Sequence, residues 1–108
     1  MDNRPGRLSL ADLKRPAERL RFWAAMRKDA AERIMAAPDR WQEHVGLWSH
    51  AMYCSNACAL ELGLVKAPCG NVIDFYDPQT IMQELEQDIA KIESLLSKLE
   101  SLEKRLGD

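Results

Sequence analysis

The amino-acid sequence predicts an all-α fold: a helical hairpin followed by a long C-terminal helix of coiled-coil type. Apolar residues recur at helical spacing in three segments, capping and turn residues separate these segments, and no segment reads as a strand with a partner strand. The 108 residues, 46% hydrophobic and 30% charged, are expected to form a single domain.

The long C-terminal helix is predicted over residues 77–107. Asp77 has the side chain of an N-cap, and Pro78 suits the first helical position, where no N–H is needed. At the other end, Gly107 is expected to close the helix in the left-handed conformation, and Lys104 and Arg105 complement the helix dipole. Both ends of the helix are therefore marked in the sequence.

A heptad pattern runs through this helix. One seam position is occupied four times, by Leu85, Ile92, Leu99 and Leu106, and Asp88 interrupts the apolar stripe once. Further apolar residues widen the stripe beyond a two-stranded seam: Met82, Ile89 and Leu96. A stripe of this width requires more than one partner helix.

The first helix is predicted from Pro16 to about Ala37, and residues 1–15 are expected to form an N-terminal arm because Pro16 disfavours helix at the preceding residue. Arg27 falls within the main apolar stripe, where its stem can pack while its guanidinium reaches a carboxylate or the surface. Phe22 and Met26 lie roughly opposite that stripe. This helix thus has a second apolar face.

The second helix is predicted from about Arg40 to Leu62, with Asp39 and Gln42 as a capping pair and Gly63 as terminator. Residues 16–62 then form an antiparallel helical hairpin. Residues 63–76 form a packed linker, because they are too apolar for a solvated one. The expected core residues are Leu20, Trp23, Ile34, Val45, Trp48, Met52, Leu85, Ile92 and Leu95.

Three side chains that can bind a metal lie within the predicted second helix: His50, Cys54 and Cys58. A fourth, Cys69, comes after a turn. Thiolate and imidazole are ligands that zinc prefers, but about 12 Å of helix separates positions i and i+8, so the three helical residues would not share one ion. Three cysteines, an odd number, also argue against a disulfide framework. We expect buried thiols and no metal here, with a metal or thiol sensor as an alternative function.

The sequence contains no phosphate-binding glycine loop, no nucleophile elbow and no paired carboxylates on an apolar face, so neither enzymatic activity nor a cofactor is expected. The first alternative function, ahead of the metal or thiol sensor, is a nucleic-acid-binding regulator that uses the basic N-terminal segment. Its candidate residues are Arg4, Arg7, Lys14, Arg15, Arg19 and Arg21. Acidic residues interrupt this segment, and the net charge of the chain is −2. A solvated helix face is the preferred interpretation.

The favoured function is that of a small non-catalytic adaptor, regulator or inhibitor that binds another protein through helical surfaces. The candidate partner-binding residues are Phe22, Met26, Leu99, Leu102 and Leu106. The last helix, about 29 residues and roughly 43 Å long, is longer than either predicted helix of the hairpin. Its final leucines would lack a partner within the chain, which predicts a homodimer, parallel or antiparallel. No apolar run is long enough to span a bilayer, and a cytoplasmic location is expected.

Overall fold

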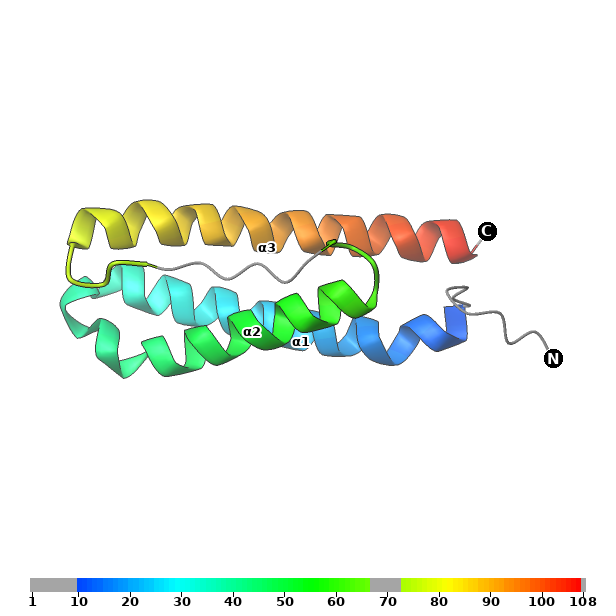
Figure 1. Cartoon of the computed structure of the whole chain (residues 1–108), viewed down its shortest axis with the longest axis horizontal. Coiled ribbons are helices and arrows are strands. Elements are labelled where there is room, and N and C mark those ends of the chain that lie inside the picture. The colour runs from blue at the N-terminus through cyan, green and yellow to red at the C-terminus, as the bar shows by residue number, and fades with distance from the viewer. Residues whose placement is uncertain (1–9, 67–72, 108) are drawn as a thin grey trace.

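The computed structural model describes residues 10–66 and 73–107, with side chains from Lys14 onward. It contains α1 (Leu10–Ala36), the 3₁₀ helix η1 (Pro38–Glu43), α2 (Val45–Glu61) and α3 (Pro78–Gly107). The three α-helices lie side by side in an elongated bundle, in which α2 and η1 together return along α1 and α3 runs along both (Figure 1). The predicted all-α fold, a hairpin with a long C-terminal helix, is confirmed. Across the described ranges, every helix is too short or too polar to cross a membrane.

The start of α3 is capped as predicted. The Asp77 carboxylate accepts a hydrogen bond from the backbone N–H of Gln79 at 3.2 Å and another from the Thr80 hydroxyl at 2.7 Å. Pro78 is the first helical residue, and the Ile81 N–H donates to the Asp77 carbonyl at 3.0 Å. The end of α3 differs from the prediction: Gly107 is still helical and does not take a positive φ, so it does not act as a left-handed cap.

The beginning of α1 differs from the prediction more than any other helix end that the structure describes. The helix starts at Leu10 and continues through Pro16, so residues 10–15 do not belong to an N-terminal arm; residues 1–9 lie outside the described part. An internal proline removes one backbone hydrogen bond and costs about 3 kcal/mol. Tertiary packing can outweigh this local cost. Directly after Pro16, Ala17 and Leu20 are buried against residues of α2 and α3.

The hairpin turn is a short 3₁₀ helix, and the predicted capping pair of Asp39 and Gln42 is wrong. Pro38 does end the first helix, but it also opens η1 with Ala37 at the N-cap position, so Asp39 lies inside the element and makes no cap bond. The second α-helix therefore begins at Val45 instead of Arg40, with His44 at its N-cap position and no side-chain cap bond.

The end of α2 follows the prediction that Gly63 terminates it. Gly63 has a φ of +73°, the left-handed conformation that glycine adopts without steric cost. Its N–H donates to the Leu60 carbonyl at 3.0 Å, and the Leu64 N–H donates to the Ala59 carbonyl at 2.9 Å. These two bonds form a Schellman motif, which turns the chain away from the helix axis.

The core consists of two apolar clusters placed one after the other along the bundle. The first contains Ala17, Leu20, Cys58, Ala59, Leu62, Leu95 and Leu99. The second contains Ala30, Ala31, Ile34, Trp48, Met52, Ile73, Ile81 and Leu85. Of the predicted core residues, Trp23 and Val45 are only partly buried, and the other seven are buried.

The described part of the linker is packed, as predicted. Ile73 is buried in the second cluster, and Phe75 contacts two tryptophans. Its ring stacks on Trp41, with centroids 5.0 Å apart, and meets the edge of Trp48 at 5.8 Å. Because residues 67–72 lie outside the described part, the prediction is tested only at the two ends of the linker.

The final leucines of α3 have a partner within the chain, contrary to the sequence-based expectation. Leu99 is 0% exposed in the first cluster, and Leu102 and Leu106 are partly buried against that cluster. Leu99 shares its cluster with Leu20 of α1 and Cys58 of α2, so the helical hairpin itself reaches the last turns of α3. The argument that uncovered leucines drive dimerisation therefore fails, although dimerisation itself stays a prediction.

The burial of Leu99 predicts its contribution to stability. Replacement of this side chain, Leu99→Ala, should lower the free energy of unfolding by about 2–5 kcal/mol, because it leaves a cavity in the first cluster. Leu60→Ala, the same change at a side chain that is 39% exposed, should cost less than about 1 kcal/mol. Denaturation in urea measures both values. Equal losses for the two variants would contradict the placement of Leu99.

Candidate functional site

A buried ion pair joins α1 to α3 at the middle of the bundle. Arg27 and Asp88 are 2% and 0% exposed. The Arg27 Nε donates to Asp88 Oδ2 at 2.9 Å, and Arg27 Nη2 pairs with Asp88 Oδ1, so the guanidinium and the carboxylate meet through two bonds. This bidentate arrangement is the strong geometry for such a pair. Of the two positions foreseen for the Arg27 head, a carboxylate or the surface, the structure has the carboxylate.

Side chains of α2 make further hydrogen bonds with this ion pair. Trp48 Nε1 donates to Asp88 Oδ2 at 3.0 Å, while Arg27 Nη1 donates to Ser55 Oγ at 3.1 Å and to Asn56 Oδ1 at 3.2 Å. Among the described residues, no buried side-chain nitrogen or oxygen is without a hydrogen-bond partner. The cluster is thus a satisfied polar layer between the two apolar clusters, and its charges neutralise each other.

The first predicted partner-binding residues, Phe22 and Met26, lie on the outer side of α1. Phe22 is 56% exposed, and Met26 is partly buried. The Phe22 ring meets the Trp23 ring edge-on with centroids 5.0 Å apart, and Trp23 makes the same kind of contact with His50 of α2, also at 5.0 Å. One helical turn before His50, Leu47 is 39% exposed. We call this surface the aromatic face: Phe22, Trp23, Met26, Leu47 and His50.

The candidate metal ligands are not gathered into one site. His50 Nε2 lies 3.7 Å from Cys54 Sγ, which forms a pair, whereas Cys58 is buried in the first apolar cluster. Cys69 lies outside the described residues, and the described part of the chain contains no group of three potential ligands. Burial raises the pKa of the Cys58 thiol, although nearby Arg19 acts in the opposite direction.

The candidate nucleic-acid residues do not form one uninterrupted surface. Arg4 and Arg7 lie outside the described part, while Lys14, Arg15 and Arg19 are exposed on α1. Arg21 is engaged by α3: its Nη1 donates to Glu103 Oε2 at 3.1 Å, and the hydrogen bonds to Arg21 lower the pKa of Glu103. Acidic groups of α3 thus neutralise part of the basic charge of α1.

Comparisons with models of protein families, with curated proteins and with solved structures found no match.

The burial of the ion pair predicts that loss of the Asp88 charge destabilises the protein much more than loss of a carboxylate from a surface ion pair. Asp88→Asn keeps the shape of the side chain but leaves the Arg27 charge without its counter-ion, so the free energy of unfolding should fall by about 3–5 kcal/mol. Glu103→Gln removes a carboxylate from a surface pair and should cost less than about 1 kcal/mol. Chemical denaturation measures both changes.

A double variant separates the value of the pair from the penalty of an unpaired charge. Arg27→Met/Asp88→Leu replaces both ions with apolar groups of similar volume and should recover much of the stability lost in Asp88→Asn. If the double variant is no more stable than the single one, the loss in Asp88→Asn has another origin.

The difference in burial between Cys54 and Cys58 predicts a difference in the reactivity of their thiols. Because thiolate is the reacting form, iodoacetamide should modify Cys58 at least about tenfold more slowly than Cys54 in the folded protein at neutral pH. The raised pKa of Cys58 means that its rate should keep increasing above the pH at which an ordinary thiol is ionised. Mass spectrometry of peptides gives both rates, and urea-unfolded protein is the control. Equal rates in the folded state would argue against the burial of Cys58.

Proposed function

We propose that the protein acts by binding another protein through the aromatic face, as a small non-catalytic adaptor, regulator or inhibitor. The observation that carries the proposal is Phe22, a large apolar side chain that is 56% exposed although the bundle has two well-filled clusters beside it. Its ring rests on Trp23 and contributes to neither cluster.

The composition of the aromatic face suits a protein interface. Aromatic residues and methionine are enriched at the centres of interfaces, and tryptophan is frequent among the residues that contribute most to binding. The edge contacts of Trp23 with Phe22 and His50 hold the rings in place before a partner arrives, which reduces the entropy lost on binding. A polar boundary follows one turn beyond Met26, where Arg33 Nε and Asp29 Oδ2 form an ion pair at 2.8 Å.

The position of the face favours an amphipathic helix as the partner's contribution. Trp23 belongs to α1 and His50 to α2, so the face extends across two antiparallel helices. An additional helix with apolar residues at i, i+3, i+4 and i+7 could lie against both of them, a common mode of peptide recognition. The same mode would serve a second copy of this chain, and the predicted homodimer, if it forms, would then use α1 and α2 and not the final leucines of α3.

Photo-cross-linking tests the proposal at single residues. The photoreactive residue p-benzoylphenylalanine is introduced at position 22 and, in a separate protein, at position 53, because Tyr53 is an aromatic residue of α2 that is 77% exposed and outside the face. Irradiation in source cells should yield a discrete adduct from position 22 and a much weaker one from position 53. Met26→Glu should remove the adduct at position 22, since a charge within the face opposes apolar burial.

The mass of the adduct identifies the partner. An adduct of twice the mass of the chain would show a homodimer, and a different mass would show a second protein. Adducts of equal yield from positions 22 and 53, or an adduct that Met26→Glu does not reduce, would exclude the aromatic face as the binding surface.

A further inference from the structure

His50 and Cys54 of α2 form a pair of side chains whose spacing suits a metal ion. They are four residues apart on the helix, and His50 Nε2 lies 3.7 Å from Cys54 Sγ. A tetrahedral zinc ion binds a thiolate at about 2.3 Å and an imidazole nitrogen at about 2.0–2.1 Å, which puts these two donor atoms about 3.6 Å apart. The observed separation therefore matches two of the four positions of a tetrahedral zinc site.

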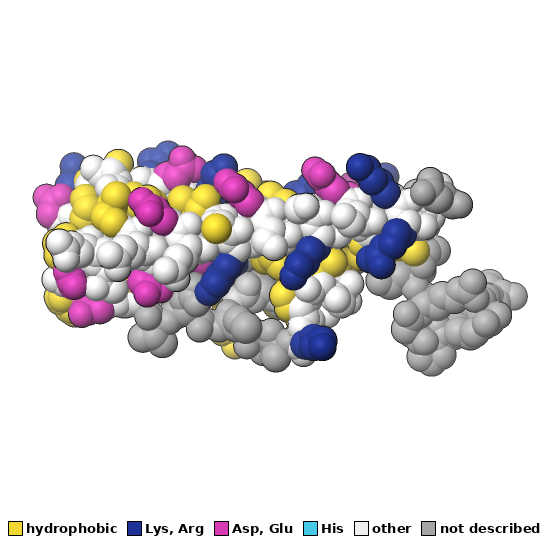
Figure 2. Space-filling view, turned by 90° about the horizontal axis from the view of Figure 1, so that it is seen from above, with side chains coloured by type: hydrophobic (Ala, Val, Ile, Leu, Met, Phe, Trp, Pro, Cys, Tyr) yellow, Lys and Arg dark blue, Asp and Glu magenta, His cyan; other side chains and the backbone are white. Residues whose placement is uncertain are grey.

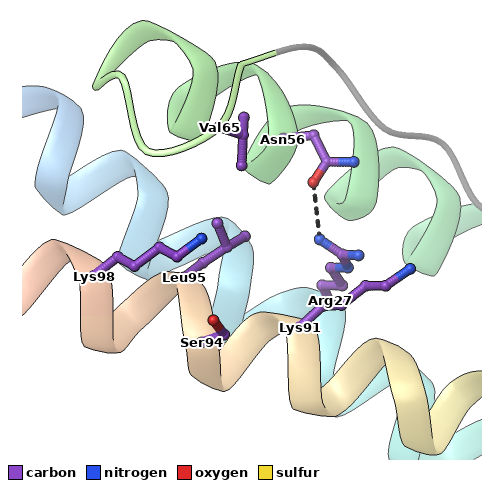
Figure 3. Close-up of a pocket in the computed structure, with 7 residues that line it drawn as sticks. All are labelled: Arg27, Asn56, Val65, Lys91, Ser94, Leu95 and Lys98. Atoms are coloured by element: carbon purple, nitrogen blue, oxygen red, sulfur yellow. Dashed lines mark hydrogen bonds between the residues drawn. The ribbon is translucent and has the colours of Figure 1, made fainter.

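The pair lies on the outer side of α2, where an ion can reach it. His50 is exposed and Cys54 is half-buried, and the Trp23 ring meets the imidazole edge-on, which limits its rotation. Asn56 points instead from α2 toward Arg27 (Figure 3). Because successive helical residues are turned by about 100°, Cys54 points nearly opposite to Asn56. The bundle thus uses one side of α2, and the pair lies on another.

One copy of the chain supplies only part of a zinc site at this position. A structural zinc ion has four protein ligands, and the described residues contain no group of three potential ligands. One thiolate also neutralises only one of the two charges of the ion. A second pair of the same composition supplies both missing ligands and the second thiolate. The resulting site has two thiolates, two imidazoles and no net charge, so apolar side chains can cover it at little cost.

We propose that His50 and Cys54 of two copies of the chain bind one zinc ion, which joins the copies through the aromatic face. This inference rests on the proposed function and names the partner at that face as a second copy. A twofold axis between antiparallel α2 helices places His50 of one copy opposite Cys54 of the other, because the same residues form both sides of such an interface. Each Cys54 thiol releases its proton to solvent and binds the ion as thiolate.

The distribution of charge favours α2 as the helix that meets its own copy. A residue close to a twofold axis faces the same residue of the other copy, so a charge there meets a like charge. From Val45 to Leu60, α2 contains no Asp, Glu, Lys or Arg, although 30% of the chain is charged. The face of the molecule along α3 carries charged side chains of both signs (Figure 2), and α1 contains many as well. Two copies of α2 can therefore approach each other without repulsion between their own charges.

Sedimentation velocity with and without zinc tests the proposal. The full chain is purified without a chelator and kept with a phosphine reductant, so that no disulfide joins two copies. Zinc should lower the dissociation constant of the dimer by at least about tenfold, because the ion completes its coordination only with ligands from both copies. Bound zinc should amount to one ion per two chains, and EDTA should reverse the association.

Substitutions identify the ligands. Cys54→Ser and His50→Ala should each abolish the effect of zinc on association. Cys69→Ser and His44→Ala are the matched controls, because they make the same changes outside the pair, and they should retain one ion per two chains. Cys54→His supplies an imidazole in place of the thiolate and should restore zinc-dependent association, which a general loss of folding would not allow. Cobalt(II) in place of zinc should show thiolate absorption in the wild type and none in Cys54→Ser.

Three results would overturn the proposal: no binding of zinc, one ion per chain without association, or loss of binding in Cys69→Ser. The photoreactive residue at position 22 separates these results from the proposed function. If zinc does not bind and position 22 still gives its adduct, the zinc site is wrong and the proposed function stands. If zinc joins two copies and position 22 gives no adduct, the zinc site stands and the aromatic face is not the binding surface.

Discussion

The ion pair between Arg27 and Asp88 determines how the three helices fit together. Apolar stripes alone tolerate several alignments, because a heptad repeat of leucines looks similar after a shift of seven residues. A shift of α3 by one heptad, about 10.5 Å, would leave two charges unpaired among apolar side chains, at a cost of several kcal/mol for each ion. The position of α2 is fixed in the same way, because Trp48 donates a hydrogen bond to Asp88 and Ser55 accepts one from Arg27. The polar layer thus selects one alignment, and the two apolar clusters on either side of it supply the burial.

Much of the fold could be predicted because the relevant signals are local. The cap at Asp77, the left-handed Gly63 and the apolar stripes depend on residues within one or two turns of each other. The errors arise where distant contacts outweigh a local preference. Pro16 was expected to begin a helix, yet α1 continues through it because Ala17 and Leu20 pack against helices far along the chain. Leu99, which the sequence alone suggests is exposed, is likewise buried by residues far along the chain, among them Leu20 and Cys58.

The candidate sites show the same limit. Arg27 and Asp88 were each visible in the sequence as a charge within an apolar stripe, but 61 positions separate them, and their pairing depends on how α1 and α3 align. Two opposite charges within two apolar stripes are nevertheless a signal that could have suggested a pair.

The distribution of charge between α1 and α3 gives the sides of the bundle different properties. Residues 1–33 contain 9 basic and 5 acidic side chains, and residues 74–108 contain 4 basic and 9 acidic ones. Part of this difference is used where α1 meets α3, through the pairs of Arg21 with Glu103 and Lys28 with Glu93. The exposed aromatic side chain Phe22 of α1 lies beside Trp23, whose ring faces His50 of α2. Ion pairs therefore join α1 to α3 on one side of the bundle, while the side on which α1 meets α2 presents the aromatic face.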